Sequence, residues 1–363
     1  MNTLNREFNP HITPVDEDVL RPRFALGLQG GGSWGAWTAG VIKVLIPALC
    51  ARGTITAVSG TSAGAMNGAA LVAGLNTDGP YDGVRRVEEL WNNVKGYGQL
   101  FGIHPSLTQI FADSASPWPN LPKTYFNMAA AFGAISPVPL IGGTTHILSN
   151  ILRKVVPDIS AVQKGETKLF TNTVRTHIFT GASDHVVHTG RNLTWDSIAC
   201  SAALKEIGAH VIRDRADLLA QYSEMFYIYH DGAYKINPAI TPLLDTNPTD
   251  LIVISLHSPK SAEQALATRD KLYQGEIHMD MATLTLDDGA RLNVHLIDMD
   301  APDSWDNTSR LNSSPAFIDL LMKQGEAFAH EWLASNGDSL GVQSSHRPRQ
   351  ETLNRLAEIG VRY

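Results

Sequence analysis

A glycine-rich turn between a strand-like run and a helix-like run is the feature that most limits the folds open to this chain. The stretch from Phe24 to Trp37 reads FALGLQGGGSWGAW, so three consecutive glycines follow an apolar strand and precede an apolar helix. A strand, a tight glycine turn and a helix are the opening of a βα unit, whose next strand runs parallel to the first. This order predicts an α/β fold with the turn at a strand end.

The same order repeats directly afterwards. TITAV at 54–58 is strand-like, a serine-containing turn follows, and Ala63–Leu75 is a helix candidate. An amphipathic helix is expected around 84–94, and a late helix should begin at Ser314-Pro315 and end at Gly337. We therefore expect a largely parallel sheet with helices on its faces. The further strand-like runs lie at 168–174, 226–233, 250–256 and 292–298.

The segment from about 96 to 156 differs in texture from the rest of the chain. It contains many Gly, Pro and aromatic residues with short apolar bursts, as in SPWPNLPKTYF and AISPVPLIGG. It is too irregular for the sheet and too apolar for a linker. We interpret it as a cap-like insertion over a site, and a plain structural insertion is an equally open alternative.

Charge and cysteine content exclude several classes of protein. The chain has 36 acidic and 29 basic residues and a net charge of −7, which gives no reason to expect nucleic-acid binding. Cys50 and Cys200 form no disulfide framework or zinc motif, and His185 and His188 lack a third ligand, so no metal is expected.

The polar N-terminus lacks a secretory signal pattern, so a cytoplasmic location is predicted. Two uncharged stretches, 24–42 and 53–77, are expected to be core elements rather than membrane spans.

The first loop also fits the dinucleotide-binding pattern G-x-G-x-x-G, with Gly35 as its last glycine. A dinucleotide site needs an acidic residue about twenty positions later to hold the ribose hydroxyls. That region reads TITAVSGTSAG and contains no acid, and no Lys-Ser/Thr pair closes a phosphate-binding loop. A nucleotide-dependent oxidoreductase is therefore the weaker interpretation of this loop.

The turn after the second strand reads Gly60-Thr61-Ser62-Ala63-Gly64, which is the G-x-S-x-G pattern of a nucleophile elbow. Small neighbours permit the strained turn, and the positive end of the following helix favours a serine alkoxide. An α/β-hydrolase places several strands before its elbow, whereas here only one clear strand precedes the pair formed by the glycine loop and the elbow. The downstream residues His257 and His295 could complete a catalytic triad, but most such histidines are surface or core residues, so we do not expect this role.

The glycine loop then acquires a chemical role. Attack on an ester carbonyl creates an oxyanion, which needs backbone N–H donors placed where its charge develops. Gly30, Gly31 and Gly32 can turn their amides outward without side-chain clashes. Asp231, in YHDGAYKINPAI, ends an apolar strand before Gly232, which permits a sharp turn. Desolvation can raise a carboxylate's pKa towards that of a useful base, so a Ser-Asp dyad without histidine is chemically reasonable.

The motifs QGGGSWG, GTSAG and DGA, in this order, resemble those of the patatin-like phospholipase family, and longer segments are similar to its bacterial intracellular branch. The resemblance covers roughly residues 23–342. It implies a three-layer α/β/α fold with a mostly parallel central sheet, forming an acyl hydrolase domain between an arm at 1–22 and a tail at 343–363. Residue by residue, it implies Ser62 as nucleophile, Asp231 as base and Gly30–Gly32 as oxyanion loop. The longer segments include SPVPLIGGTTHILSNILRKVV, KLFTNTVRTHIFT, IACSAAL and SRLNSSPAFIDLLMKQGEAFAHEWLA.

Three positions depart from the family pattern. Trp34 stands where the family usually has Arg or Lys, Asp231-Gly232-Ala233 replaces the commoner Asp-Gly-Gly, and Lys205 replaces a frequent proline. The missing loop cation leaves open whether phospholipids or neutral esters are preferred.

The expected function is a calcium-independent lipid acyl hydrolase of the phospholipase A, lysophospholipase or esterase type. It would cleave fatty-acyl esters through an acyl-enzyme, with the Ala63 amide joining the glycine amides and with no cofactor. The expected partner is a lipid acyl ester, with peripheral contact to the inner membrane surface as an option. Besides the oxidoreductase, a non-catalytic lipid-binding protein on a patatin scaffold remains an alternative. Acyl length, headgroup and oligomeric state are not determined by the sequence.

Overall fold

A computed structural model describes most of the region that carries the motifs. The predicted arm at 1–22, most of the cap-like insertion and the end of the tail lie largely outside the described residues, so the domain boundaries stay predictions. The structure describes residues 21–96, 143–204, 212, 226–256, 292–302, 305, 309–310 and 312–346.

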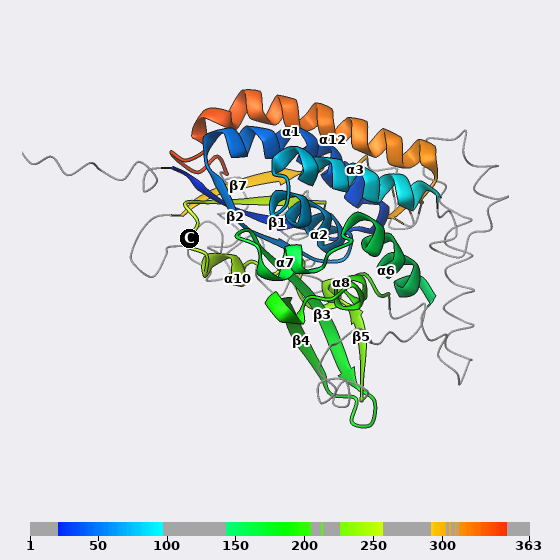
Figure 1. The fold of residues 1–363 in the computed structure, drawn as a ribbon. Helices are drawn as coiled ribbons and strands as arrows, with labels where there is room; N and C mark the ends of the chain where they lie inside the picture. The colour runs from blue at the N-terminus through cyan, green and yellow to red at the C-terminus, as the bar shows by residue number, and fades with distance from the viewer. Residues whose placement is uncertain are drawn as a thin grey trace, which may run out of the picture.

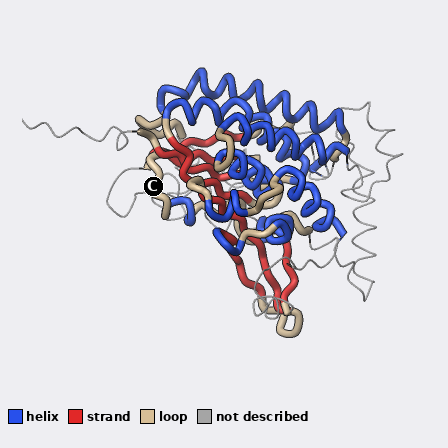
Figure 2. The backbone as a smooth tube through the Cα atoms, in the orientation of Figure 1, coloured by secondary structure: helices blue, strands red, loops and turns tan. Residues whose placement is uncertain are grey.

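Within the described residues, a seven-stranded, mostly parallel sheet forms the centre of the fold (Figures 1 and 2). Its order is β4-β3-β2-β1-β6-β7, and β5 also pairs with β3. The contacts β3-β2, β2-β1, β1-β6 and β6-β7 are parallel, whereas β4 and β5 run antiparallel to β3. The predicted mostly parallel α/β fold is confirmed. The strands are β1 (Arg23–Leu28), β2 (Thr54–Gly60), β3 (Lys168–His177), β4 (Ser183–Thr189), β5 (Tyr227–Asp231), β6 (Asp250–Ser255) and β7 (Asn293–Asp298).

Long helices cover one face of this sheet, and α12 lies along the outer side of α1 (Figure 1). Their close approach depends on glycine, because a Cβ added to Gly40 would lie 2.0 Å from the Met322 carbonyl oxygen, and one added to Gly325 would lie 2.0 Å from that of Trp37. The late helix begins after Ser314 and ends before Gly337, as predicted. The helices of this face are α1 (Gly35–Arg52), α2 (Ala63–Leu75), α3 (Pro80–Gly96) and α12 (Pro315–Asn336).

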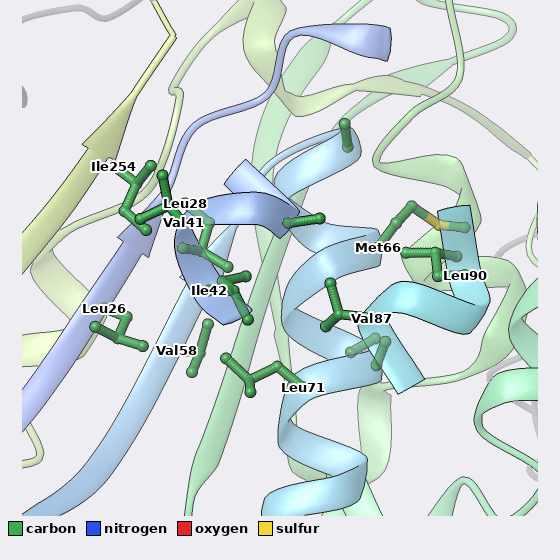
Figure 3. Close-up of a cluster of buried hydrophobic side chains, with 14 of the residues drawn as sticks. Leu26, Leu28, Val41, Ile42, Val58, Met66, Leu71, Val87, Leu90 and Ile254 are labelled. Atoms are coloured by element: carbon green, nitrogen blue, oxygen red, sulfur yellow. The ribbon is translucent and has the colours of Figure 1, made fainter. Parts of the chain in front are cut away.

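The main core lies between the sheet and these helices (Figure 3). Leu26, Leu28 and Val58 from the strands meet Ile42 and Leu71 from α1 and α2, and all five are fully buried. Burial of each such side chain contributes roughly 1.5–3 kcal/mol. Of the described helices, Gly32–Arg52 alone is long and apolar enough to cross a membrane, but 67% of its most apolar window is buried inside the fold. It serves as the buried helix that the sequence indicates.

A smaller core covers the opposite face of the sheet. Small or β-branched side chains of the central strands, such as Ala25, Ala57 and Val253, pack there against Ile240 and Leu243. Leu243 belongs to the short helix α10 (Thr241–Leu244), so helices lie on both faces and the layers are three. Strands buried on both faces read as nearly continuous apolar runs, which explains the sequence LIVIS in β6.

The end of the predicted cap-like insertion is a packed helix. This helix, α6 (Gly143–Val155), contacts α8 (Trp195–Cys200) and α3, and its Ile151, Leu152 and Val155 are buried. Residues 97–142 lie outside the described residues, so the cap itself stays a prediction. The remaining short elements are α7 (Ser160–Lys164), η2 (Gly32–Trp34), η3 (Gly190–Asn192), η5 (Gly232–Tyr234) and η8 (Gly337–Ser339).

Candidate active site

The G-x-S-x-G turn forms a strained junction between β2 and α2. Ser62 has φ 56° and ψ −125°, a positive φ that is uncommon for a residue with a side chain. Both motif glycines are sterically required, because a Cβ on Gly60 would lie 2.2 Å from the Gly64 carbonyl oxygen, and one on Gly64 would lie 2.1 Å from that of Leu28. Ser62 is 8% exposed at the N-terminus of α2. The turn therefore has the geometry of a nucleophile elbow.

The first glycine loop packs directly against this elbow. A Cβ on Gly30 would lie 2.6 Å from the Ser62 Cβ, and one on Gly35 would lie 2.6 Å from the Ala63 Cβ. Gly32 has φ +59°, a conformation that favours glycine, and its Cα faces the Arg310 carbonyl oxygen. The tertiary fold thus places the two glycine motifs, predicted separately, side by side.

Some backbone amides around Ser62 donate hydrogen bonds within the fold, and others do not. The Gly30 amide donates to Asn237 Oδ1 at 2.6 Å, and Asn237 Nδ2 donates back to the Gly30 carbonyl at 3.1 Å. The Ser62 amide donates to Ser201 Oγ at 3.0 Å. None of the hydrogen bonds among the described residues takes the amide of Gly31, Gly32 or Ala63. Of the four amides predicted to bind an oxyanion, that of Gly30 already donates to Asn237, and those of Gly31, Gly32 and Ala63 stay candidates.

Asp231 ends β5 as a buried carboxylate, only 4% exposed. Its Oδ1 accepts the Ala233 amide at 2.8 Å, and its own amide donates to the Ala203 carbonyl at 2.7 Å. A Cβ on Gly232 would lie 2.4 Å from the Asn172 carbonyl oxygen, so the turn after Asp231 requires glycine. The sequence motif Asp-Gly therefore has a steric basis as well as a chemical one.

Strand register brings the elbow and the acid together. On one edge of β3, Thr171 pairs with Gly60 of β2 and Thr173 pairs with Asp231 of β5, while β4 occupies the other edge. Because β2 is parallel to β3 and β5 is antiparallel, the carboxyl ends of β2 and β5 meet head to head along this edge. Ser62 lies two residues beyond Gly60. The turn that carries Ser62 and the strand end that carries Asp231 are therefore neighbours along this edge of β3.

His185 and His188, the two histidines considered as metal ligands, contact polar side chains of β3. His185 Nε2 lies 3.2 Å from Asn172 Nδ2, and burial, helped by the Lys235 charge, lowers the pKa of His185. His188 contacts Thr173 Oγ1 at 2.8 Å. Within the residues that the structure describes, no three His, Cys, Asp or Glu side chains gather in a way that could hold a metal.

His295, the other histidine considered for a triad, lies at the opposite end of the sheet from the elbow. Its Nε2 contacts Asp250 at 2.8 Å and its Nδ1 contacts Ser345 at 2.9 Å, near the amino ends of β6 and β7. The elbow follows the carboxyl end of β2, which is parallel to these strands through β1. His257 lies outside the described residues.

Trp34 is packed inside the fold beside the glycine loop. It is 5% exposed, and its Nε1 donates to Ser309 Oγ at 2.9 Å. The guanidinium of Arg310 lies over the indole at 4.3 Å from the ring centroid, and the Trp305 ring lies 6.0 Å away. The chain thus lacks a cation at position 34 but brings one to that ring from a distant segment.

Sequence reasoning missed three residues that build this site: Asn172, Ser201 and Asn237. Each is buried and hydrogen-bonded to a loop that carries a predicted motif. Ser201 is a polar residue inside the apolar run IACSAAL, which is a signal for a buried polar role. Asn172 in KLFTNTV has polar neighbours and gives no such signal.

Comparison with known proteins supports the family resemblance. Residues 26–183 match the model of the patatin-like phospholipase family. The predicted resemblance to that family is therefore confirmed over this segment. The matching segment includes the glycine loop and Ser62 and ends before Asp231. No curated protein matches the chain.

Among solved structures, the chain is similar to VipD from Legionella pneumophila, at 15% identity and a TM-score of 0.32 over 85% of this chain and 67% of VipD. It is also similar to the type III effector protein ExoU, at 15% identity and a TM-score of 0.33 over 87% of this chain and 53% of ExoU. The ExoU–SpcU complex from Pseudomonas aeruginosa gives 14% identity and a TM-score of 0.34 over 87% of this chain and 52% of the matched chain. The chain therefore spans about half the length of ExoU.

Proposed function

We propose that this protein is a serine acyl hydrolase that cleaves fatty-acyl esters of lipids through a dyad of Ser62 and Asp231. The observation that supports the proposal is the head-to-head meeting of β2 and β5 on one edge of β3, because the strained turn of Ser62 follows one strand and the buried Asp231 ends the other. The match to the patatin-like phospholipase family supports lipid esters as the substrate class.

The chemistry follows from the positions of these groups. Asp231 accepts the Ser62 hydroxyl proton as Oγ attacks the ester carbonyl carbon, and the carbonyl oxygen becomes an oxyanion. Collapse of this intermediate expels the alcohol, which takes the proton from Asp231. Water then attacks the acyl-enzyme, gives its proton to Asp231, and releases the fatty acid as Ser62 Oγ is reprotonated.

Backbone amides would stabilise the oxyanion in both halves. The amides of Gly31, Gly32 and Ala63 are the candidates, and the N-terminus of α2 adds its positive end. Gly30 contributes differently, because its missing side chain lets the loop rest on Ser62. The role assigned to Gly30 is therefore steric.

Covalent labelling of the full chain tests the proposal. A fluorophosphonate should modify Ser62, as located by peptide mass spectrometry, and the protein should hydrolyse a chromogenic fatty-acyl ester. Ser62→Ala and Asp231→Asn should each lower kcat by about a thousandfold or more, and the double variant should be little worse because the two act as a unit. Asp250→Asn is a matched control, since Asp250 is also buried but lies at the amino end of β6, at the opposite end of the sheet from the elbow. Ser59→Ala is a control for the loss of a buried hydroxyl inside β2.

The result also separates the two alternatives. Near-normal turnover of Asp231→Asn would remove the dyad. Lipid binding without labelling or turnover would indicate a non-catalytic scaffold, and a bound-cofactor absorbance would indicate the oxidoreductase.

A further inference from the structure

Asn172 lies where β3 changes partners along the edge that organises the site. Residues up to Thr171 pair with β2, and residues from Thr173 pair with β5. The side chain of Asn172 is fully buried. Asn172 therefore stands at the junction between the strand that leads to the nucleophile elbow and the strand that ends in Asp231.

The side-chain amide of Asn172 joins two loops of the site. Its Oδ1 accepts a hydrogen bond from the Thr61 hydroxyl, and its Nδ2 donates to the Ile236 carbonyl at 2.9 Å. Thr61 directly precedes Ser62. Ile236 directly precedes Asn237, which binds both the N–H and the C=O of Gly30. One amide thus links the elbow to the segment that holds the glycine loop.

The main-chain carbonyl of Asn172 extends the same connection. It accepts the Ser201 hydroxyl at 2.7 Å, and Ser201 Oγ accepts the Ser62 amide at 3.0 Å. The Ser201 carbonyl in turn accepts the Gly232 amide at 3.3 Å. The Cα of Gly232 also faces this Asn172 carbonyl, with no space for a side chain between them. Asn172 is therefore connected, by hydrogen bonds or close backbone contact, to the residues beside both Ser62 and Asp231.

We propose that Asn172 is a positioning residue for acyl transfer, which sets the separation and orientation of Ser62 and the Asp231 carboxylate. The inference rests on the proposed function. A buried amide costs free energy unless its groups are paired, and here the pairing is made with the loops that meet at the reacting atoms. Misplacement of reacting groups by about 1 Å costs about a hundredfold in rate, so loss of this side-chain amide should lower the rate as well as the stability.

Asn172→Ala tests the proposal through two readouts. It should lower kcat about 10- to 100-fold and lower the second-order rate of fluorophosphonate labelling in parallel, because both depend on how Ser62 is oriented. The KM of the ester should change by less than about twofold, since the variant leaves substrate contacts in place.

Asn76→Ala is the matched control for lost hydrogen bonding. Asn76 Nδ2 donates to the carbonyls of Ala161 and Thr167, and its Oδ1 accepts the Thr167 amide, but it caps the far end of α2 from Ser62. This variant should lower Tm without a matching loss of kcat. If Asn172→Ala lost no more kcat than Asn76→Ala at equal loss of Tm, the positioning role would be overturned.

Thr61→Val keeps the test decisive even if Asn172→Ala fails to fold. It is close to isosteric and removes only the hydroxyl that binds Asn172. A drop of about 3- to 10-fold in kcat and in labelling rate is expected, the size of one hydrogen bond. Unchanged kcat and labelling would overturn the proposal. Failure of the proposed function is a separate result, because wild-type protein would then show neither labelling nor turnover.

Discussion

Substitution of Gly30 by alanine should strongly reduce activity and should also lower the free energy of unfolding by about 1–3 kcal/mol, because the site is already closely packed. The added Cβ would lie 2.6 Å from both the Ser62 Cβ and the Thr61 carbonyl oxygen, whereas ordinary contacts begin at 3.4 Å. The loop and the elbow must therefore separate by roughly 0.8 Å beside Ser62, the proposed nucleophile. Displacement of that size is expected to cost about a hundredfold in kcat/KM.

The assay compares hydrolysis of a chromogenic ester with thermal unfolding of the same samples. Gly68→Ala is the matched control, because its Cβ would meet only side-chain methyl groups at 3.2 Å, on the same helix that Ser62 begins. It should keep kcat/KM within about threefold, since flexible side chains can yield by a few tenths of an ångström. Retention of wild-type labelling by Gly30→Ala would refute the view that the glycine loop rests on the nucleophile.

Two further predictions concern Trp34 and His185. Trp34→Phe should destabilise the fold by about 1–2 kcal/mol in thermal unfolding, because it removes the hydrogen bond to Ser309 and part of the buried ring. The ratio of kcat/KM for anionic and neutral esters should stay unchanged, and a changed ratio would instead assign the indole to headgroup selection. Because burial lowers the pKa of His185 in the folded state, the unfolded chain binds the proton more readily. Stability should therefore fall as pH drops below the unfolded value of about 6.5, and His185→Gln should show a flatter decline of Tm between about pH 7.5 and 5.5. Equal slopes for the two proteins would rule out His185 as a source of the acid sensitivity.

Local physical constraints made much of this protein predictable from its sequence. Apolar runs followed by Gly-rich or Ser-containing turns identified β1, β2 and the helices after them, because the turn geometry leaves no space for side chains. The bounds of α12 followed from a Ser-Pro start and a glycine stop. The elbow at Ser62 was predictable for the same reason, since its motif is short and contiguous.

The tertiary structure decided which of these local pieces meet. Ser62 and Ser201, and Gly30 and Asn237, are hydrogen-bonded across separations of 139 and 207 residues, and no periodicity in the sequence encodes such pairs. The return of β5 to the edge of β3 already used by β2 turned an aspartate in a plausible strand-end context into the neighbour of the elbow. The tertiary fold also brings Asn237 to the Gly30 amide, which therefore donates to Asn237 Oδ1 and is not left for an oxyanion. Buried polar groups form hydrogen bonds with the partners that the fold provides. Sequence therefore determined the chemical groups and their local geometry, and strand register determined their assembly.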